Sequence, residues 1–381
     1  MERADRRSAS AILAWLAMDP QRLTQKIKEQ ARSLGFDAIG VAPIEAVPGE
    51  LLQIWLARQF QGEMSYMERT AEKRVDPRKV LPGVRSMISL SLNYRHPYEL
   101  PYQEPESGAI SRYASGDDYH DVLNRKLETL LAFIKGLDPQ AEGKIYVDTG
   151  PVMDKHWAAH SGIGWLGKHT NVLSREAGSW FFLGEILLNL DLQYDMPGED
   201  FCGSCTRCID ACPTDAITEP YVLDSRRCIS YLTIELREDI PEEFRPSMKN
   251  LIFGCDICQD VCPWNDEVPF SMVEDFQPRE GNRAPDLREL SRLSAEDFSQ
   301  RYRKSPIKRA KWRGLMRNVA VAMGNSGNPD MIPELENLME SEDLMIRRHA
   351  EWAVSALGAQ KEEKDASRLE KRADARGEEE V

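Results

Sequence analysis

The sequence predicts an α+β protein: a mixed sheet covered by helices, then a cysteine-rich segment, then a C-terminal α-helical repeat. Three patterns predict this class. Apolar strand-like and helix-like segments alternate through the first half of the 381-residue chain, all eight cysteines fall within residues 202–262, and an alanine-rich helical pattern that begins at Arg317 recurs at Arg348. A chain of this length is expected to form two or three domains.

The first half carries the pattern of a helix-covered sheet. Apolar residues at helical spacing predict a helix over residues 21–34, ended by Gly35, and another over residues 121–137. Apolar runs predict buried strands over residues 36–43, 86–94 and 144–148, and residues 180–190 form a further strongly apolar segment. Because strands alternate with helices, we expect one sheet domain over residues 21–197.

The composition is that of an ordinary globular protein, with 41% hydrophobic and 29% charged residues. No apolar run reaches the roughly 20 residues that a membrane-spanning helix needs, so we expect no membrane partner. The pair Arg6-Arg7 and the apolar run 11–18 lack the cleavage site and the flanking residues of an export signal. We therefore expect residues 1–20 to be a helical extension of a cytoplasmic protein.

The cysteines follow the spacing of bacterial ferredoxins. One run is complete and a second lacks only the first thiol, where Ile252 stands: Cys202-x2-Cys205-x2-Cys208-x3-Cys212-Pro213 and Cys255-x2-Cys258-x3-Cys262-Pro263. Short gaps let three thiolates of one loop bind one face of a cubane, so the pattern predicts two [4Fe–4S] clusters in a ferredoxin-like domain over residues 198–275. Two four-cysteine zinc sites are the alternative, because they would use the same number of ligands.

The spacing also predicts how the thiols divide. In two-cluster ferredoxins the cysteine before proline binds the other cluster, and Cys228 is the one thiol outside both runs. The predicted ligands are therefore Cys202, Cys205, Cys208 and Cys262 for cluster one, and Cys212, Cys228, Cys255 and Cys258 for cluster two.

Two polar features stand beside the predicted strands of the first half. Asp148 ends an apolar strand, and a carboxylate that faces a cleft there has a pKa raised by partial desolvation, which suits proton donation. The alternative is that Asp148 only caps the turn at Gly150-Pro151. The glycines of residues 162–168 predict close backbone approach to a flat, bulky cofactor, because their spacing fits neither a phosphate loop nor a dinucleotide fingerprint.

A basic segment lies near the C-terminus of a chain whose net charge is −14. Residues 301–329 contain no acidic residue, and Tyr302 and Trp312 stand among eight cations: Arg301, Arg303, Lys304, Lys308, Arg309, Lys311, Arg313 and Arg317. Cations interleaved with aromatic residues suit a phosphate backbone and an unstacked base, so a nucleic-acid surface is favoured over a solvated helix face. The repeat at Arg317 and Arg348 predicts a HEAT-like domain over residues 280–359, followed by a charged tail over residues 360–381.

Together these parts resemble the epoxyqueuosine reductases, a family of cobalamin-dependent iron–sulfur enzymes that act on tRNA. The resemblance covers about residues 21–358. Its most specific marks are Glu72-Lys-Arg74-Val, Asp118-Tyr-His-Asp121, Val147-Asp-Thr-Gly150, Gly162-Ile-Gly164, Cys202-Gly-Ser-Cys205, Arg227-Cys-Ile-Ser230 and Gly254-Cys-Asp256.

The resemblance implies an activity and a set of site residues. The family reduces the epoxide of epoxyqueuosine at the wobble position of tRNA to the alkene of queuosine, and its clusters pass electrons singly to cobalamin. Asp148 falls on the family's proton donor. The residues at cobalamin-lining positions are Arg74, Ser111, Asp148, Val172, Leu183 and Ser230; some members carry cysteine where Ser111 stands. We expect tRNA to contact Lys308, Arg309, Lys311 and Arg313, an external electron donor to act, and the protein to be a monomer.

Other functions remain open from the sequence. A reductive dehalogenase-like enzyme with a small substrate would also couple cobalamin to two clusters, and a non-catalytic iron–sulfur electron carrier would need no cobalamin. The pattern Asp118-x-His120 lacks the glycine of cobalt-ligating motifs, since Leu123 stands there. We therefore expect His120 to be a structural or substrate-facing residue rather than a cobalt ligand.

Overall fold

The computed structural model describes residues 19–359, and the expected charged tail and most of the expected N-terminal extension lie outside this range. The helices are α2 Pro20–Ser33, α3 Gly49–Ala57, α4 Ser65–Arg69, α5 Ala71–Val75, α6 Tyr119–Leu137, α7 Asp154–His160, α8 Arg207–Asp210, α9 Ile229–Ile234, α10 Ile257–Asp260, α11 Leu287–Ser291, α12 Ala295–Arg301, α13 Lys311–Asn325 and α14 Ile332–Met339. A further helical segment covers residues 344–359. The strands are β1 Ala38–Pro43, β2 Ser86–Asn93, β3 Ala109–Ile110, β4 Gly143–Tyr146, β5 Trp165–Leu166, β6 Val172–Leu173, β7 Phe181–Leu188, β8 Ile217–Glu219, β9 Val222–Leu223 and β10 Leu251–Phe253.

The main sheet has the strand order β1-β2-β7-β4, and every neighbouring pair in it is antiparallel. The expectation of a mixed sheet is therefore wrong for this sheet. Alternating strands and helices would produce parallel neighbours if each helix returned the chain to the adjacent position. Here α6 carries the chain from β2 to β4, which are not neighbours, and β7 later enters between them antiparallel to both.

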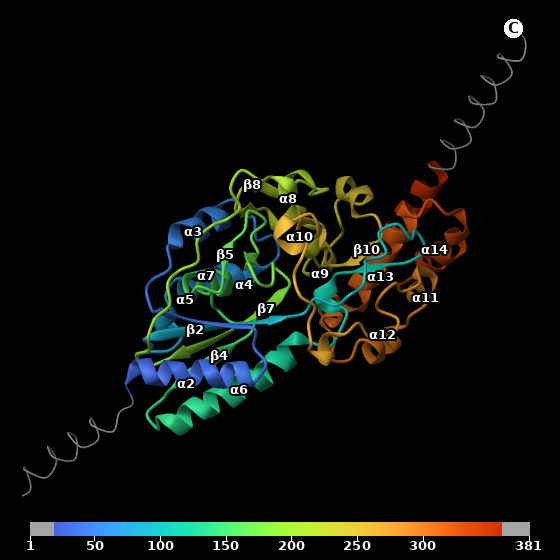
Figure 1. Cartoon of the computed structure of the whole chain (residues 1–381). Helices are drawn as coiled ribbons and strands as arrows, with labels where there is room; N and C mark the ends of the chain where they lie inside the picture. The colour runs from blue at the N-terminus through green and yellow to red at the C-terminus, as the bar shows by residue number, and fades with distance from the viewer. Residues whose placement is uncertain (1–18, 360–381) are drawn as a thin grey trace, which may run out of the picture.

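The two faces of the sheet have different coverings. Ile88, Leu90 and Ile186 belong to a core with α2 and α6 on one face, and Figure 1 shows these two helices lying together below the strands. On the other face Met87 packs with Trp157 of α7. The predicted helix at the start of the described chain is confirmed, because Asp19 caps α2 through the Arg22 N–H and Gly35 follows it with a φ of +86°.

The cysteine-rich part and the C-terminal helices are joined to the first half by shared structure. β3 pairs in parallel with β10, although more than a hundred residues separate them in the sequence. A single core joins Ile110 and Ile252 from these strands to Leu315, Leu335 and other residues of the C-terminal helices. The C-terminal helices therefore pack against the rest of the protein rather than standing alone.

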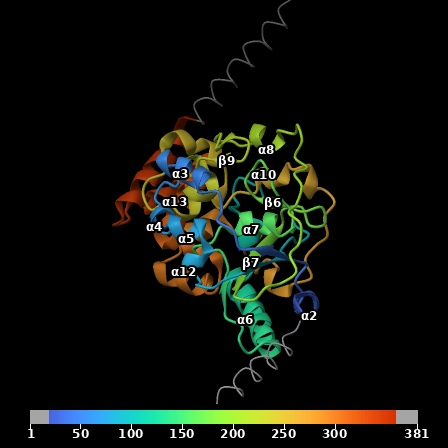
Figure 2. The ribbon, with the colours of Figure 1, turned by 90° about the vertical axis from the view of Figure 1, so that its left-hand side faces the viewer.

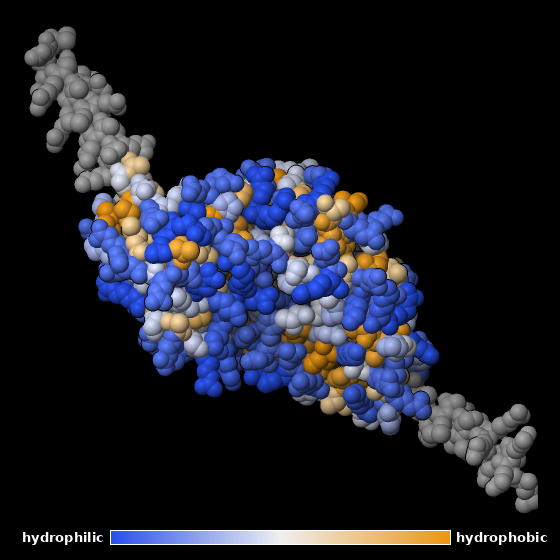
Figure 3. Space-filling view, turned by 180° about the vertical axis from the view of Figure 1, so that it is seen from behind, coloured by the Kyte–Doolittle hydropathy of each residue, from blue (hydrophilic) through white to orange (hydrophobic). Residues whose placement is uncertain are grey.

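The outer views show how the short elements are placed. In Figure 2, α3, α4 and α5 run down one side of the view while α2 and α6 lie at its base. The face in Figure 3 is largely hydrophilic, with apolar residues in separate small patches. Among the helices of residues 19–359, none combines the length and the apolar character needed to cross a bilayer.

Candidate active site and cluster cages

A cavity of about 370 Å³ lies where the sheet meets the cysteine-rich part. Its wall includes the start of β7, the turn after β4, the first residues of α7, and the segments around α9 and α10. Five of the six predicted cobalamin-lining residues are on this wall: Ser111, Asp148, Val172, Leu183 and Ser230. The structure thus brings together residues that are more than a hundred positions apart in the sequence.

Arg74 is the predicted residue that is not on the wall. Its side chain is buried, and it donates to the Val152 carbonyl at 2.9 Å and to the Thr70 hydroxyl at 3.0 Å. Val152 lies in the loop between Asp148 and α7. Arg74 is therefore placed to support the loop that carries Asp148.

The backbone holds Asp148 in an unusual conformation. Asp148 has a φ of +55°, and the Thr149 N–H donates to the Val147 carbonyl at 2.5 Å, which closes a three-residue turn around it. A positive φ is uncommon for any residue other than glycine and is found at functional sites. Its side chain is 65% exposed, and that exposed surface faces the cavity. The carboxylate accepts a hydrogen bond from Tyr119 rather than from its own turn, so the turn-cap alternative does not describe it.

Asp148 belongs to a hydrogen-bonded group at the start of α6. The Tyr119 hydroxyl donates to Asp148 Oδ2 at 2.9 Å, and His120 Nε2 lies 3.6 Å from the same oxygen. On its other side, His120 Nδ1 lies 2.7 Å from Asp118 Oδ1. The Tyr119 ring is stacked on Phe182, with ring centroids 4.3 Å apart, which orients its hydroxyl.

These contacts set the charges of the group. Desolvation by the protein around the cavity would raise the pKa of Asp148, but the nearby His120 ring and the hydrogen bond from Tyr119 outweigh it and hold that pKa below its usual value. Burial likewise opposes the charge on His120, yet Asp118 and Asp148 raise its pKa to about 9. The expectation of a raised pKa at Asp148 is therefore wrong for the free protein. At neutral pH the proton resides on His120, and Asp148 is ionised.

Two acidic residues near the cavity were missed by the sequence reasoning. Asp154 begins α7 and lines the cavity, and Glu185 lies in the middle of β7 with no exposed surface. A single charged residue inside the apolar run 181–188 was the available signal for Glu185. Asp154 left no comparable signal, because an acidic residue in the first turn is ordinary helix chemistry.

The glycines of residues 162–168 do not face the cavity as expected. A side-chain carbon added at Gly164 would meet the Leu173 carbonyl, and one added at Gly162 would meet the Met196 carbonyl. These glycines allow two stretches of the protein's own backbone to approach each other. They shape the wall of the site indirectly, by packing the loop behind it.

The eight cysteines face two separate cavities. Cys212, Cys228, Cys255 and Cys258 line the large cavity, whereas Cys202, Cys205, Cys208 and Cys262 line a second cavity of about 120 Å³. Each group consists only of thiols, the donor type that iron–sulfur clusters require. The grouping coincides with the predicted ligand sets, and the thiols of predicted cluster two share a cavity with Asp148 and Ser111.

The basic segment is only partly available to a partner. Arg309 forms two hydrogen bonds with Glu235, at 2.8 and 2.9 Å, and Arg313 lies 2.6 Å from Asp343. Lys308 and Lys311 are exposed, and within residues 19–359 neither has an ion-pair partner. Of the four predicted tRNA contacts, these two lysines are therefore free.

The expected roles of three other residues in this segment are wrong. Tyr302 is 1% exposed and belongs to the core. Trp312 packs against the same core and donates its indole N–H to the Leu293 carbonyl, so neither ring is free to stack on a base. Arg317 has no exposed surface.

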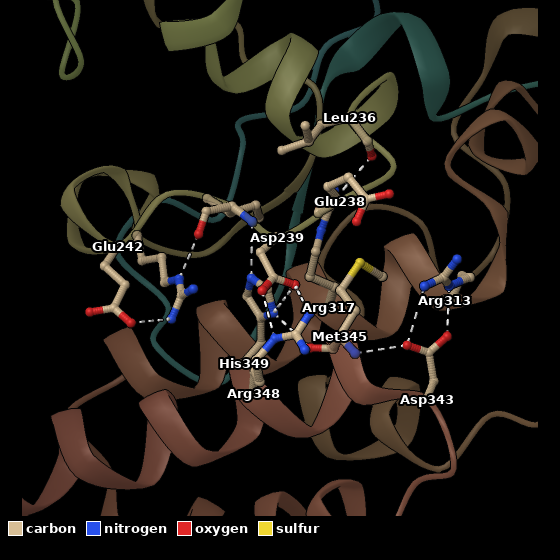
Figure 4. Close-up of polar contacts among 12 residues, drawn as sticks. Leu236, Glu238, Asp239, Glu242, Arg313, Arg317, Asp343, Met345, Arg348 and His349 are labelled. Atoms are coloured by element: carbon tan, nitrogen blue, oxygen red, sulfur yellow. Dashed lines mark hydrogen bonds and ion pairs between the residues drawn. The ribbon is translucent and has the colours of Figure 1, made fainter. Parts of the chain in front are cut away.

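Arg317 instead binds backbone carbonyls of the cysteine-rich part. Its guanidinium donates to the carbonyls of Leu232 at 2.5 Å, Leu236 at 3.0 Å and Glu238 at 2.7 Å, as Figure 4 shows for the last two. In the same view Arg348, which matches Arg317 in the sequence pattern, pairs with Asp239 near the surface. The two matching arginines thus make one buried and one exposed contact.

Comparison with known proteins agrees with this arrangement. A family model described as "4Fe-4S double cluster binding domain" matches residues 201–265, and one described as "Epoxyqueuosine reductase QueG, DUF1730" matches residues 74–149. The first match favours iron–sulfur clusters over the zinc alternative.

Curated relatives match most of the chain. The epoxyqueuosine reductase of Leadbetterella byssophila is 46% identical over 299 residues, which cover 78% of this chain and 97% of the relative. That of Escherichia coli is 41% identical over 342 residues, covering 89% of this chain and 90% of the relative. A solved epoxyqueuosine reductase with an epoxyqueuosine-modified tRNA-Tyr stem loop superposes with a TM-score of 0.82 at 32% identity, over 88% of this chain and 90% of that one. The chain belongs to the epoxyqueuosine reductase family.

Proposed function

We propose that this protein reduces the epoxide of epoxyqueuosine in tRNA to the alkene of queuosine. The reaction takes up two electrons and two protons and releases one water. The observation that carries the proposal is the shared cavity, which is lined by Asp148 and by the four thiols of predicted cluster two. A site for a proton-coupled reduction needs an electron source and a proton source at the same place. The substrate in this proposal is inferred from the family to which the chain belongs.

The proposed cofactors are two [4Fe–4S] clusters and cobalamin. When bound, cobalamin would supply the strongly reducing chemistry that the reaction needs. Ser111, Val172, Leu183 and Ser230 would hold it in the large cavity, whose wall mixes apolar and hydroxyl groups as a bulky cofactor requires. Arg74 would act through the loop it supports rather than by contact.

The clusters would form a relay. Cys212, Cys228, Cys255 and Cys258 would hold cluster two in the cavity that they share with Asp148 and Ser111. Cys202, Cys205, Cys208 and Cys262 would hold cluster one in the smaller cavity, and the two clusters would supply one-electron transfer from an external donor. Lys168 donates to the Gly203 and Cys205 carbonyls at 2.7 and 2.8 Å, which braces the loop of cluster one.

Asp148 would be the group that transfers a proton to the substrate oxygen. Because it is ionised in the free protein, it must first receive a proton. Tyr119 and His120 are in position to supply and relay one. The turn around Asp148 aims the carboxylate into the cavity, where the modified base would enter after leaving the anticodon stack.

The tRNA would bind along the C-terminal helices, which we propose form a HEAT-like domain over residues 280–359. Lys308 and Lys311 would contact phosphates directly. Arg309 and Arg313 would do so by exchanging Glu235 and Asp343 for phosphate oxygens. Residues 21–197 would form the cobalamin domain, with Ser230 contributed by the cluster domain over residues 198–275. The protein would act as a cytoplasmic monomer.

Anaerobic reconstitution with iron, sulfide and cobalamin, followed by assay on a stem loop carrying epoxyqueuosine, tests this function. We expect conversion to queuosine by the wild type. Asp148→Asn should retain both clusters and cobalamin but lose turnover. The control Asp121→Asn, at an exposed position in the first turn of α6, should retain the cofactors and the turnover. Full activity of Asp148→Asn would remove Asp148 from the mechanism. Reduction of an organohalide without action on the stem loop, or absence of bound corrinoid, would replace the proposed function with one of the two alternatives.

A further inference from the structure

Asp154 and Glu185 form an acidic pair that the proposed function does not use. Asp154 lies on the cavity wall. Along β7, Phe181, Phe182 and Leu183 line the cavity, and Glu185 shares the face of Phe181 and Leu183 because alternate residues of a strand point to the same side. Glu185 therefore lies just beyond the lining residues of β7, and Asp154 is close enough for each acid to act on the charge of the other.

The pair lacks the hydrogen-bond donors that two ionised carboxylates would need. Both oxygens of Glu185 and Oδ1 of Asp154 are buried and have no partner among the donors of the described chain. Ser89, which is paired with Glu185 across β2 and β7, also has a buried hydroxyl without a partner. Native structures rarely leave such groups unsatisfied. Neither carboxylate has a hydrogen to donate, so one proton placed between them would supply the missing bond.

The surrounding charges do not neutralise the pair. Burial and the nearby charge of Asp148 raise the pKa of Asp154 to about 7, and burial and Asp154 raise the pKa of Glu185 well above its usual value. Lys155 and Arg74 favour ionisation of Asp154. Both are engaged elsewhere, however: Lys155 donates to Asn171 at 2.9 Å, and Arg74 donates to Val152.

We propose that Asp154 and Glu185 share a single proton and act as an internal proton store, which releases that proton into the cavity through Asp154. The inference rests on the proposed function, because epoxide reduction consumes two protons and Asp148 can deliver only one at a time. One proton is taken up when the first carbon–oxygen bond opens to a hydroxyl, and the other when that hydroxyl leaves as water. Both electrons come from the cofactors, and solvent returns the proton to the pair between turnovers.

The first test examines the shared proton without substrate. Infrared difference spectra of the wild-type holoenzyme, recorded across a pH titration, should show the C=O band of a protonated carboxylic acid that disappears near pH 7. Glu185→Gln and Asp154→Asn should each lose this band. Ser91→Ala is the matched control, because Ser91 is buried on the same strand as Ser89 and is paired with Leu183 rather than with an acid. A band that is absent from the wild type, or present in all three variants, would overturn the proposal.

The second test examines delivery. With pre-reduced enzyme and a modified stem loop, single-turnover rates should fall by about 10²-fold in Glu185→Gln and Asp154→Asn, the usual range for removing a proton-transfer group. Stem-loop affinity and the cluster and corrinoid spectra should stay unchanged. The wild-type rate should decline above pH 7, the Glu185→Gln rate should be independent of pH there, and Asp154→Glu should restore most of the activity.

The outcomes separate this proposal from the proposed function. A wild-type rate in Glu185→Gln at every pH, or a loss of rate accompanied by loss of clusters or corrinoid, would show that the pair has only a structural role. If the wild type shows the titrating band but does not convert the stem loop, the proposed function fails while the shared proton stands.

Discussion

Replacing Arg317 with methionine should release the cysteine-rich part from the C-terminal helices. Methionine keeps most of the buried volume but leaves the carbonyls of Leu232, Leu236 and Glu238 without their donor. The Leu232 carbonyl belongs to α9 and the other two belong to the segment after it, and α9 begins directly after Cys228. Asn318, the next residue of α13, bonds the Thr233 and Ile252 carbonyls at 2.8 and 2.9 Å. The substitution therefore removes contacts that hold α9, the helix next to Cys228 of predicted cluster two.

The expected cost follows from these contacts. Each unsatisfied buried carbonyl costs about 1–3 kcal/mol. Part of this is recovered, because burial disfavours the guanidinium charge and lowers the pKa of Arg317 to about 10. With three such carbonyls and this partial recovery, we expect a net loss of about 3–5 kcal/mol. Arg348→Met is the matched control: it removes an ion pair with Asp239 whose arginine is 49% exposed, which is worth at most ~1 kcal/mol.

Thermal unfolding and cluster content measure the effect. We expect the melting temperature of the reconstituted Arg317→Met variant to fall by roughly 5–10 °C, and its iron content to fall toward about half as cluster two is lost. Arg348→Met should resemble the wild type in both. Equal melting temperatures for the two variants, or equal loss of both clusters in Arg317→Met, would refute the reasoning.

Three further predictions concern pH, RNA and the clusters. Burial opposes the charge of His349 and lowers its pKa to about 4, whereas the pKa of histidine in an unfolded chain is about 6.5. The free energy of unfolding should therefore fall by up to ~3 kcal/mol as the pH drops from 6.5 to 4. The urea midpoint of His349→Gln should fall less than that of the wild type over the same range. A double Lys308→Glu, Lys311→Glu variant should weaken stem-loop binding and reduce its salt dependence by about two charges, whereas Arg309→Gln should weaken it less; equal losses would contradict the pairing seen in the free protein. Cys228→Ser should eliminate one cluster signal in electron paramagnetic resonance and retain the other, and loss of both would contradict the division of ligands.

Local patterns were the part of the fold that the sequence predicted well. The helices α2 and α6 and the strands β1, β2 and β4 lie close to the predicted ranges, and β7 lies within the apolar segment 180–190, because apolar periodicity is a property of neighbouring residues. The strand order was not predictable in this way. The insertion of β7 between β2 and β4 depends on contacts between distant segments, which no local pattern encodes.

The same distinction applies to the site. Cysteine spacing predicted the two groups of thiols because cluster ligands follow a short local rule. The charge state of Asp148 could not be predicted, since it depends on Tyr119 and His120 from another element. The prediction that the basic residues are free to bind RNA failed for a similar reason, because Arg309 pairs with Glu235, which is far away in the sequence.

The division of the cysteines has a consequence for biosynthesis. In the proposed arrangement the first run supplies three thiols to cluster one, but that cage closes only with Cys262. Cluster two draws Cys212 from the first run and Cys255 from the second, and its α9 frame is held by Arg317. A chain that emerges from the ribosome in sequence order therefore cannot complete either cage when its first cysteine run appears. Iron–sulfur insertion must wait until late in translation or after release, and the half-made first run must be kept reduced and soluble until then.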